Sequence, residues 1–279
     1  MSPEDHSRGR LIVCPTPIGN LEDITLRTLA ALREADVIAC EDTRRTRVLL
    51  ERYGVNATLV AYHEHNEQPQ ARELVRRMHG GDVVALVSDA GMPLVSDPGY
   101  VLVRGSVAAG LEVEVLPGPS AALAALVASG LPADHWRFEG FLPRKRPQLE
   151  RVLSGPETLV AFESPQRLAK TLAVLAELDP QRRVAVCREL TKVHEEVRRG
   201  TAAELAARYA ESAPRGEIAV VISGASKAPA DIGPAVAALE RLVEAGAKPR
   251  AAAAVVAELT GAAPNALYRA LTNPKEIQR

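Results

Sequence analysis

Short apolar runs alternate with longer stretches of helical period in the first half of the chain. The runs are β-branched or otherwise apolar, and each is followed by Pro, Gly, Ser, Asp or Glu; they lie at 11–14, 37–40, 83–87 and 113–116. A shorter run at 59–61 is a candidate for a fifth strand. Between them, apolar residues recur at i, i+3 and i+4 in segments 25–35, 66–79 and 100–110. This rhythm predicts a parallel α/β sheet whose strands are buried on both faces.

The pattern breaks near 140–156 and a second α/β series follows. It predicts strands at 159–162, 184–187 and 218–222, helices at 165–178 and 201–212, and a polar stretch at 188–200. A linker rich in Ala, Pro, Gly and Ser spans 223–234, and segments 235–245 and 248–271 have helical character. Gly261 lies between two helical stretches, which is compatible with a helix-turn-helix. The expected domains are 1–140 and 141–226, both α/β, and a helical tail at 227–279.

The composition is that of a globular protein. The 279 residues carry a formal net charge of −1, with 47% apolar and 25% charged residues. A charge near zero argues against a protein that coats nucleic acid nonspecifically, but it leaves room for local basic patches. We expect no signal peptide and no membrane span, because residues 1–10 lack an apolar core and the uncharged stretch 115–133 is broken by Pro and Gly. Three cysteines without Cys-x-x-Cys spacing indicate buried thiols and a cytoplasmic protein.

Loops rich in Gly, Pro and carboxylates follow the strands of the first half. They read PTPIGNLEDIT (15–25), EDTRR (41–45), SDAGMPLVSDPG (88–99) and PGPSA (117–121). In open α/β sheets ligands bind at the carboxyl ends of strands, so these loops predict a cleft. P-loop, G-x-G-x-x-G and G-x-S-x-G motifs are absent from the sequence. The loop YHEHNE (62–67) offers His63 and His65 without a third ligand at a usual spacing, so we predict polar cleft residues or a solvated loop and no metal site.

Ten sequence blocks in order resemble the ribosomal small subunit methyltransferase I family, over about residues 10–223. Besides the strand-end loops and YHEHNE, they include ASGLP, FEGFLPRK, FESPQRL, RELTKVHEE and RGEIAVVI. The tail 246–271 is also similar to that family's tail. The resemblance implies the tetrapyrrole-methylase-like fold: two α/β domains with mainly parallel five-stranded sheets, plus a short C-terminal helical segment. It also implies a homodimer. The implied activity is methylation of the ribose 2′-oxygen of a cytidine in the decoding region of 16S ribosomal RNA, with S-adenosylmethionine as cofactor.

The family's donor-binding segments map onto the strand-end loops and onto the second domain. The resemblance therefore implies contacts with the methyl donor from Pro15, Thr16, Pro17, Gly19, Asp89, Ala90, Gly91, Met92, Pro93, Val95, Ser120, Ala121, Phe162, Leu190, Glu217 and Ala219. Two positions depart from the family pattern. Met92 stands where ribosomal members usually have Thr, which puts a hydroxyl contact there in doubt, and Gln166 stands where the family usually has His.

A neutral ribose hydroxyl is a poor nucleophile, so a general base would assist its attack. Many groups could serve: Glu41, Asp42, Asp89, Asp97, Glu163, Glu189, His63, His65, His194 and Glu195. We expect Asp89, Glu163 and Glu189 to be catalytic, because each follows a strand that points at the expected cleft. A carboxylate at a strand end can instead hold a helix N-terminus or pair with Arg.

Clustered cations predict contact with RNA phosphates. The residues are Arg44, Arg45, Arg144, Lys145, Arg146, Arg188, Lys192, Lys248 and Arg250. The expected partner is 16S rRNA, within the small ribosomal subunit. Two alternatives remain open: a tetrapyrrole methyltransferase of the same fold, and a non-catalytic RNA-binding factor for ribosome assembly.

Overall fold

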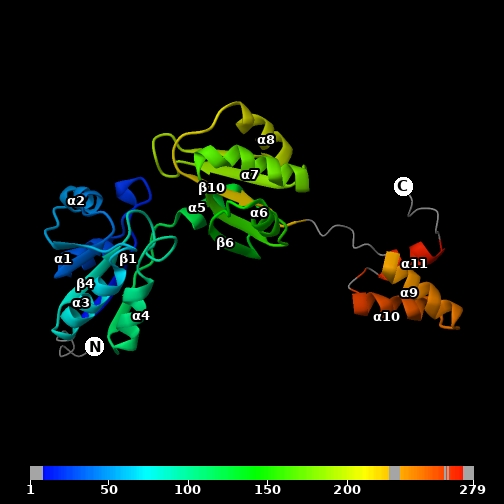
Figure 1. Ribbon diagram of the computed structural model, residues 1–279, viewed down its shortest axis with the longest axis horizontal. Helices are drawn as coiled ribbons and strands as arrows, with labels where there is room; N and C mark the ends of the chain where they lie inside the picture. The colour runs from blue at the N-terminus through cyan, green and yellow to red at the C-terminus, as the bar shows by residue number, and fades with distance from the viewer. Residues whose placement is uncertain (1–8, 226–232, 261, 263, 273–279) are drawn as a thin grey trace. The chain divides into compact units, whose positions relative to one another are not determined.

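The computed structural model describes residues 9–225, 233–260, 262 and 264–272. The chain divides into two compact units, up to Gly224 and from Ala225 onward, and each is described by itself (Figure 1). Most of the expected linker 223–234 and Gly261 lie outside the described residues. No helix in the described part of the chain is long and apolar enough to cross a membrane.

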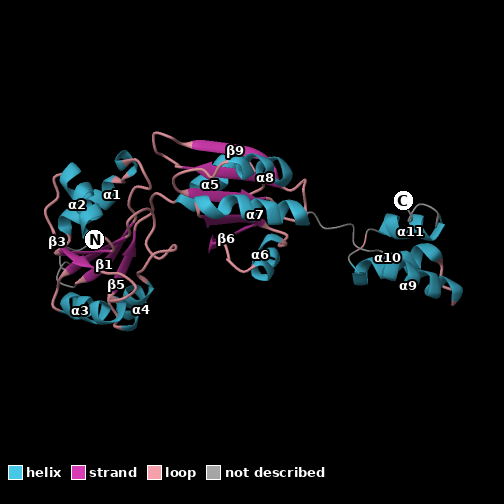
Figure 2. Cartoon of the chain, turned by 45° about the horizontal axis from the view of Figure 1, so that its top comes forward, coloured by secondary structure: helices cyan, strands magenta, loops and turns pink. Residues whose placement is uncertain are grey.

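The first sheet is wholly parallel. Its order is β3 (Thr58–Ala61), β2 (Val37–Cys40), β4 (Val83–Val87), β1 (Arg10–Cys14) and β5 (Glu112–Val115). Helices α1 (Leu26–Glu34) and α2 (Thr43–Arg52) cover one face, and α3 (Glu67–His79) and α4 (Tyr100–Ala108) cover the other (Figure 2). Strands β1, β2 and β4 are almost entirely buried, as their uninterrupted apolar runs predict.

The second sheet has the order β6 (Trp136–Phe141), β7 (Thr158–Glu163), β10 (Ile218–Ile222), β8 (Arg183–Arg188) and β9 (Glu196–Thr201). The predicted α/β fold with two sheets is confirmed. A mainly parallel arrangement holds for the first sheet alone, because only β6 and β7 pair in parallel here and β10 runs antiparallel to both its neighbours. The reversal arises because β8 and β9 are joined by a loop without a crossover helix.

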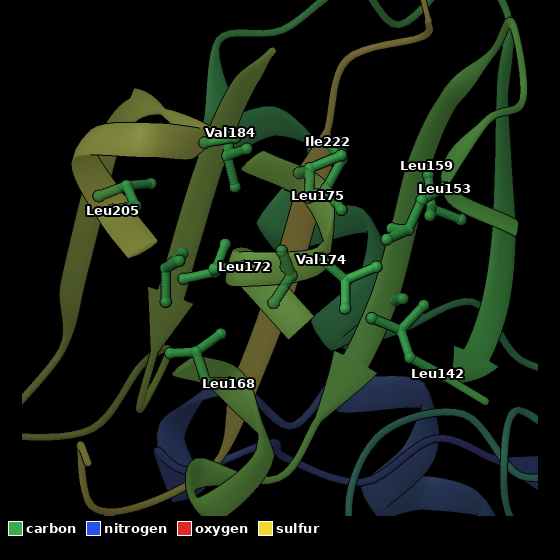
Figure 3. Close-up of a cluster of buried hydrophobic side chains, with 14 of the residues drawn as sticks. Leu142, Leu153, Leu159, Leu168, Leu172, Val174, Leu175, Val184, Leu205 and Ile222 are labelled. Carbon is green, nitrogen blue, oxygen red and sulfur yellow. The ribbon is translucent and has the colours of Figure 1, made fainter. Parts of the chain in front are cut away.

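Four helices cover the second sheet. Helices α6 (Arg146–Leu153), α7 (Pro165–Leu178) and α8 (Ala202–Glu211) contribute to the cluster in Figure 3, where leucines of α7 lie against side chains of the sheet. Helix α5 (Ala121–Ser129) packs on the opposite face. The region 140–156, read as a break in the pattern, holds the end of β6 and all of α6, and the polar stretch 188–200 holds most of β9. The expected boundary at 140/141 falls within β6.

The second unit contains three helices among its described residues: α9 (Gly233–Glu244), α10 (Pro249–Thr260) and α11 (Pro264–Thr272). They enclose a hydrophobic cluster of their own, with Leu239, Val256 and Leu267 among its buried members. The expected helices at 235–245 and 248–271 are therefore present.

Candidate functional site

A cavity of about 360 Å³ opens within the first unit, at the ends of strands from both sheets. Ten of the residues expected to contact a methyl donor line it: Ala90, Gly91, Met92, Val95, Ser120, Ala121, Phe162, Leu190, Glu217 and Ala219. The loops after β1, β4 and β5 meet the ends of β7, β8 and β10 here. Ligands of α/β sheets bind at such strand ends.

The loop after β4, residues 88–99, forms much of the cavity wall. Gly91 and Gly99 have positive φ angles of 83° and 141°, and Leu94 and Ser96 adopt φ of 72° and 68°. Positive φ is uncommon for residues with a Cβ, and it is found at ligand sites where surrounding contacts enforce it. This loop therefore has a strained backbone that the surrounding contacts must hold in place.

Hydrogen bonds between two loops fix the near end of loop 88–99, which is the end next to β4. Thr16 and Gly91 exchange backbone hydrogen bonds of 2.9 Å in both directions. The Thr16 hydroxyl donates to the Ser88 carbonyl at 2.9 Å, and the Ser88 hydroxyl donates to the Gly91 carbonyl at 3.0 Å. Thr16 thus stabilises loop 88–99 without lining the cavity itself. Met92 borders the cavity and packs partly against the first-sheet core.

Six residues expected to contact the donor do not line the cavity: Pro15, Thr16, Pro17, Gly19, Asp89 and Pro93. Two of them, Pro15 and Gly19, lie where two loops approach each other closely. A Cβ on Gly118 would lie 2.4 Å from Pro15 Cγ, and a Cβ on Gly19 would lie 2.5 Å from Lys192 Cγ. These residues bring the loops together around the cavity.

The three carboxylates expected to be catalytic all have protein partners. Glu163 borders the cavity, but it is buried and accepts hydrogen bonds from the Ser164 N–H (2.8 Å) and the Thr171 hydroxyl (2.6 Å), with an Arg167 nitrogen at 3.3 Å. Glu189, away from the lining, accepts from the Glu217 N–H at 2.8 Å and from Lys192 Nζ at 2.9 Å.

Glu189 and Asp89 each contact a backbone N–H and a cationic side chain. The Glu217 N–H and Lys192 lower the pKa of Glu189. Asp89, also outside the lining, accepts from the Asp42 N–H at 3.0 Å and lies 3.3 Å from an Arg45 nitrogen. All three carboxylates thus make contacts that hold backbone or cations in place, and their catalytic role stays a prediction.

Asp97 differs from these three. It lines the cavity, and within residues 9–225 no donor lies at hydrogen-bonding distance from its carboxylate. Burial raises its pKa to about 7, and the charges of Glu41 and Asp89 add to the effect. The sequence includes Asp97 among the carboxylate candidates, but nothing in its spacing shows that it lacks a partner. Ile18, Ser96 and Phe141 also line the cavity and were not expected there.

Many cations expected to contact RNA form ion pairs. Arg44 pairs with Asp42 at 2.7 Å and Arg188 with Glu196 at 3.6 Å, while Arg146 contacts Glu150 and Glu177. Lys192 lies between Glu189 and Glu217. By contrast Arg144, Lys145 and Lys248 are exposed and make no ion pair with the described residues, and exposed Arg250 lies 5.6 Å from the Tyr268 ring centroid.

The loop YHEHNE is ordered by its own hydrogen bonds. The Asn66 side chain accepts from the His63 N–H at 2.8 Å and donates to the Ala61 carbonyl at 2.9 Å. No cluster of His, Cys, Asp and Glu suited to a metal ion occurs among the residues that the structure describes. All three cysteines are buried and free, as expected.

Comparison with known proteins places this architecture. The sequence model of the tetrapyrrole (corrin/porphyrin) methylase family matches residues 10–206 of this chain. Among solved structures, a uroporphyrin-III C-methyltransferase from Thermus thermophilus is similar, with a TM-score of 0.55, 25% identity and coverage of 77% of this chain and 94% of that one. A structure of the Thermus thermophilus enzyme complexed with S-adenyl homocysteine has a TM-score of 0.55 at 22% identity, covering 77% and 97%.

Three curated relatives carry the name ribosomal RNA small subunit methyltransferase I. The Mesorhizobium japonicum protein is 49% identical, covering 95% of this chain and 92% of its own length. The Escherichia coli O157:H7 protein is 43% identical, covering 95% of both. The Thermotoga maritima protein is 46% identical, covering 77% of this chain and 99% of its own. The chain therefore belongs to the tetrapyrrole (corrin/porphyrin) methylases and, among them, to the ribosomal RNA small subunit methyltransferase I family.

Proposed function

We propose that this protein transfers a methyl group from S-adenosylmethionine to the ribose 2′-hydroxyl of a cytidine in the decoding region of 16S ribosomal RNA. The observation that carries the proposal is the similarity to the named relatives over nearly the whole chain. The cavity supports it, because it offers a site lined by strand ends of both sheets.

The residues around the cavity fit such a donor. Ile18, Phe162 and Leu190 supply apolar and aromatic surface suited to a purine ring. Asp97 and Glu217 supply carboxylates beside it, and S-adenosylmethionine carries positive charge on its sulfonium and ammonium groups. A carboxylate without a protein partner gains most from such a cation, so Asp97 is the residue that we assign to it. When bound, the cofactor supplies an electrophilic methyl group.

The chain contributes alignment and the exclusion of water. Positioning two reactants for in-line displacement can supply about 7–11 kcal/mol at its ideal limit. The loop 88–99 and the ends of β7 and β10 all border the site. Glu163 is the one cavity-lining member of the three expected catalytic carboxylates. We propose that it assists the attack of the ribose 2′-hydroxyl, and that Asp89 and Glu189 support the loops. An alanine variant that binds donor and methylates at the wild-type rate removes that residue from the catalytic group.

We also propose that exposed cations guide the RNA. Arg144 and Lys145 follow β6, whose last residue Phe141 lines the cavity, so phosphates bound there lie in reach of the site. Binding through phosphates weakens as salt rises. A homodimer remains a prediction of the family resemblance, and a cytoplasmic location remains a prediction from the cysteine usage; sedimentation velocity of the full chain tests the first.

The decisive experiment supplies tritiated S-adenosylmethionine with either unmethylated small ribosomal subunits or a porphyrinoid. We expect label in 16S rRNA, and nuclease digestion with mass spectrometry should find 2′-O-methylcytidine. Label in the porphyrinoid would identify a tetrapyrrole methyltransferase. Binding of the small subunit without calorimetric binding of the donor would identify an assembly factor.

A further inference from the structure

The segment 62–67 contributes two side chains, those of Tyr62 and Glu67, to a partly buried hydrogen-bond network outside the cavity lining. Tyr62 is fully buried, and its hydroxyl donates to Glu67 Oε1 at 3.2 Å. The same hydroxyl accepts the Leu102 N–H at 3.1 Å, and Glu67 Oε1 accepts the Gly99 N–H at 2.9 Å. One carboxylate oxygen and one phenol therefore serve two backbone donors on another element.

Those two donors belong to the start of α4. The first N–H groups of a helix have no partner within it and need one from elsewhere. Gly99, the N-cap of α4, provides no side chain for this purpose, so Glu67 and Tyr62 satisfy the helix from outside. A capping residue at Gly99 would be strained, because φ is 141° there and a Cβ would lie 2.7 Å from Leu94 Cδ1 and 2.9 Å from Leu86 Cδ2, so both leucines would have to shift.

The start of α4 is also the far end of the cavity wall. The near end of loop 88–99 is fixed by the exchange between Thr16 and Gly91. Between Met92 and Pro98, the only backbone hydrogen bond formed by the loop's own N–H groups within the described structure joins the Val95 N–H to the Met92 carbonyl at 3.3 Å. The path of residues 93–98 therefore depends on its two ends, and Asp97 lies two residues from the end held by Glu67.

We propose that Glu67 and Tyr62 are positioning residues that hold Asp97 and its loop in the shape that binds the methyl donor. The ligand in this statement rests on the proposed function. Glu67 and Tyr62 are absent from the cavity lining, so they act through Gly99 and α4. These hydrogen bonds give the segment 62–67 a role in holding the start of α4.

The test compares substitutions at Glu67 with the same substitution elsewhere on α3. Glu67→Leu keeps the size of the side chain but removes the acceptor, whereas Glu67→Gln keeps an acceptor oxygen. Glu73→Leu is the matched control, because Glu73 is exposed and pairs only with Arg76 among the described residues. S-adenosylhomocysteine binding is measured by calorimetry on the full chain, well below the melting temperature of each variant.

We expect Glu67→Leu to raise the Kd about tenfold, which corresponds to about 1.4 kcal/mol. The Kd of Glu67→Gln should stay within about threefold of the wild-type Kd, and the Kd of Glu73→Leu should equal the wild-type Kd. Tyr62→Phe keeps the buried ring but leaves the Leu102 N–H without its acceptor, so we expect an intermediate Kd. If Glu67→Leu does not fold, Tyr62→Phe decides by the same measurements.

A second readout needs no ligand. The carboxyl carbon of Asp97 is assigned in NMR spectra by its loss in Asp97→Asn and then titrated. Its burial and the facing charges of Glu41 and Asp89, the latter paired with Arg45, raise the pKa of Asp97. A loop released by Glu67→Leu exposes Asp97 to water, so its pKa should fall toward the usual aspartate range, while Glu73→Leu leaves it unchanged.

Wild-type Kd and wild-type Asp97 titration in both Glu67→Leu and Tyr62→Phe would overturn the positioning role. A lowered melting temperature with both readouts unchanged would also overturn it, because the network would then stabilise only the fold. A wild-type protein with no affinity for S-adenosylhomocysteine counts against the proposed function, and the Asp97 titration still decides the positioning role.

Discussion

At the scale of single residues, the partners of a carboxylate determine what it can do. Glu163 is buried with three donors around it, and Asp97 is partly buried with none among residues 9–225. The first arrangement satisfies a buried charge and the second leaves it costly. The cavity carboxylate best prepared for a positively charged ligand is therefore Asp97.

Asp97→Asn should stabilise the free protein at pH 8 while weakening donor binding. The pKa of Asp97 is raised to about 7, so between about pH 4 and pH 7 the folded state keeps a proton that the unfolded state loses. Stability therefore falls as pH rises through this window, and the asparagine variant escapes the loss. Discounted for partial exposure, we expect a gain in Tm of roughly 2–4 °C, the effect of about 1 kcal/mol.

Thermal melts at pH 4 and pH 8 check this prediction, with calorimetry for donor affinity. The two proteins should melt together at pH 4, where the wild-type carboxyl is protonated in the folded state. A variant that melts below wild type at pH 8 would show that the ionised Asp97 stabilises the fold.

Glu163→Gln should cost stability. The amide places N–H donors where one of the present donors approaches, and Arg167 loses its carboxylate. Unsatisfied buried groups cost about 1–3 kcal/mol each, so we expect the free energy of unfolding to fall by about that amount. Urea denaturation measures it, with Glu177→Gln as the control at an exposed ion pair. Equal losses in both variants would contradict the structural role.

The sequence could predict where the site lies but not how its carboxylates are paired. Strand-end loops follow from local patterns, and ten expected residues do line the cavity. The partner of Glu163 is Thr171 on the following helix, and that of Glu189 is the Glu217 N–H, 28 residues away and just before β10. Such pairs depend on tertiary contacts, which one sequence does not specify.

At the scale of elements, buried strands were easier to predict than the polar edge strands of the second sheet. Buried runs such as Val83–Val87 are apolar on both faces and are therefore easy to recognise. By contrast β6 and β9 flank the second sheet and carry residues such as Glu139, Arg198 and Arg199, so their patterns read as polar segments. Strand direction has no such signature, which is why the antiparallel pairs of the second sheet were not foreseen.

The segment after β8 is held by a lysine between two glutamates. Lys192 Nζ lies 2.9 Å from Glu189 Oε1 and 2.8 Å from Glu217 Oε2, and Leu190 and Glu217 line the cavity. Lys192→Met should therefore weaken donor binding several-fold, because it removes the charge-assisted hydrogen bonds that fix this wall. Calorimetry with S-adenosylhomocysteine measures the change. Weaker small-subunit affinity with unchanged donor affinity would instead support the RNA contact predicted for Lys192.

At the scale of the whole molecule, the second unit has a core separate from that of the first. Residues 235–270 enclose their own hydrophobic cluster, and the Thermotoga relative matches 77% of this chain with 99% of its own length. A truncated protein ending at Gly224 should therefore fold and bind S-adenosylhomocysteine like the full chain. We expect weaker binding to small subunits, since Lys248 and Arg250 are removed; equal binding in a filter assay would contradict their predicted RNA role.

The exposed cations beside β6 should dominate the salt dependence of RNA binding. Arg146 is already paired with Glu150 and Glu177, whereas Arg144 and Lys145 make no ion pair with described residues. Charge reversal at Arg144 and Lys145 should reduce the slope of log K against log salt by about one for each phosphate that the variant no longer binds. Arg146→Glu is the comparison, and an equal or larger effect there would argue against free cations as the groups that bind RNA.

The position of β10 in the second sheet affects how the chain folds as it is synthesised. All five strands of the first sheet have emerged once Val115 has left the ribosome, so that half can form early. β10, the central strand of the second sheet, ends only at Ile222, and until then β7 and β8 have open edges facing one another. Unpaired edges invite wrong pairing, and domains fold as units during synthesis. The second half must therefore wait for its last strand, which makes the interval before Ile222 emerges the period of greatest exposure to misfolding.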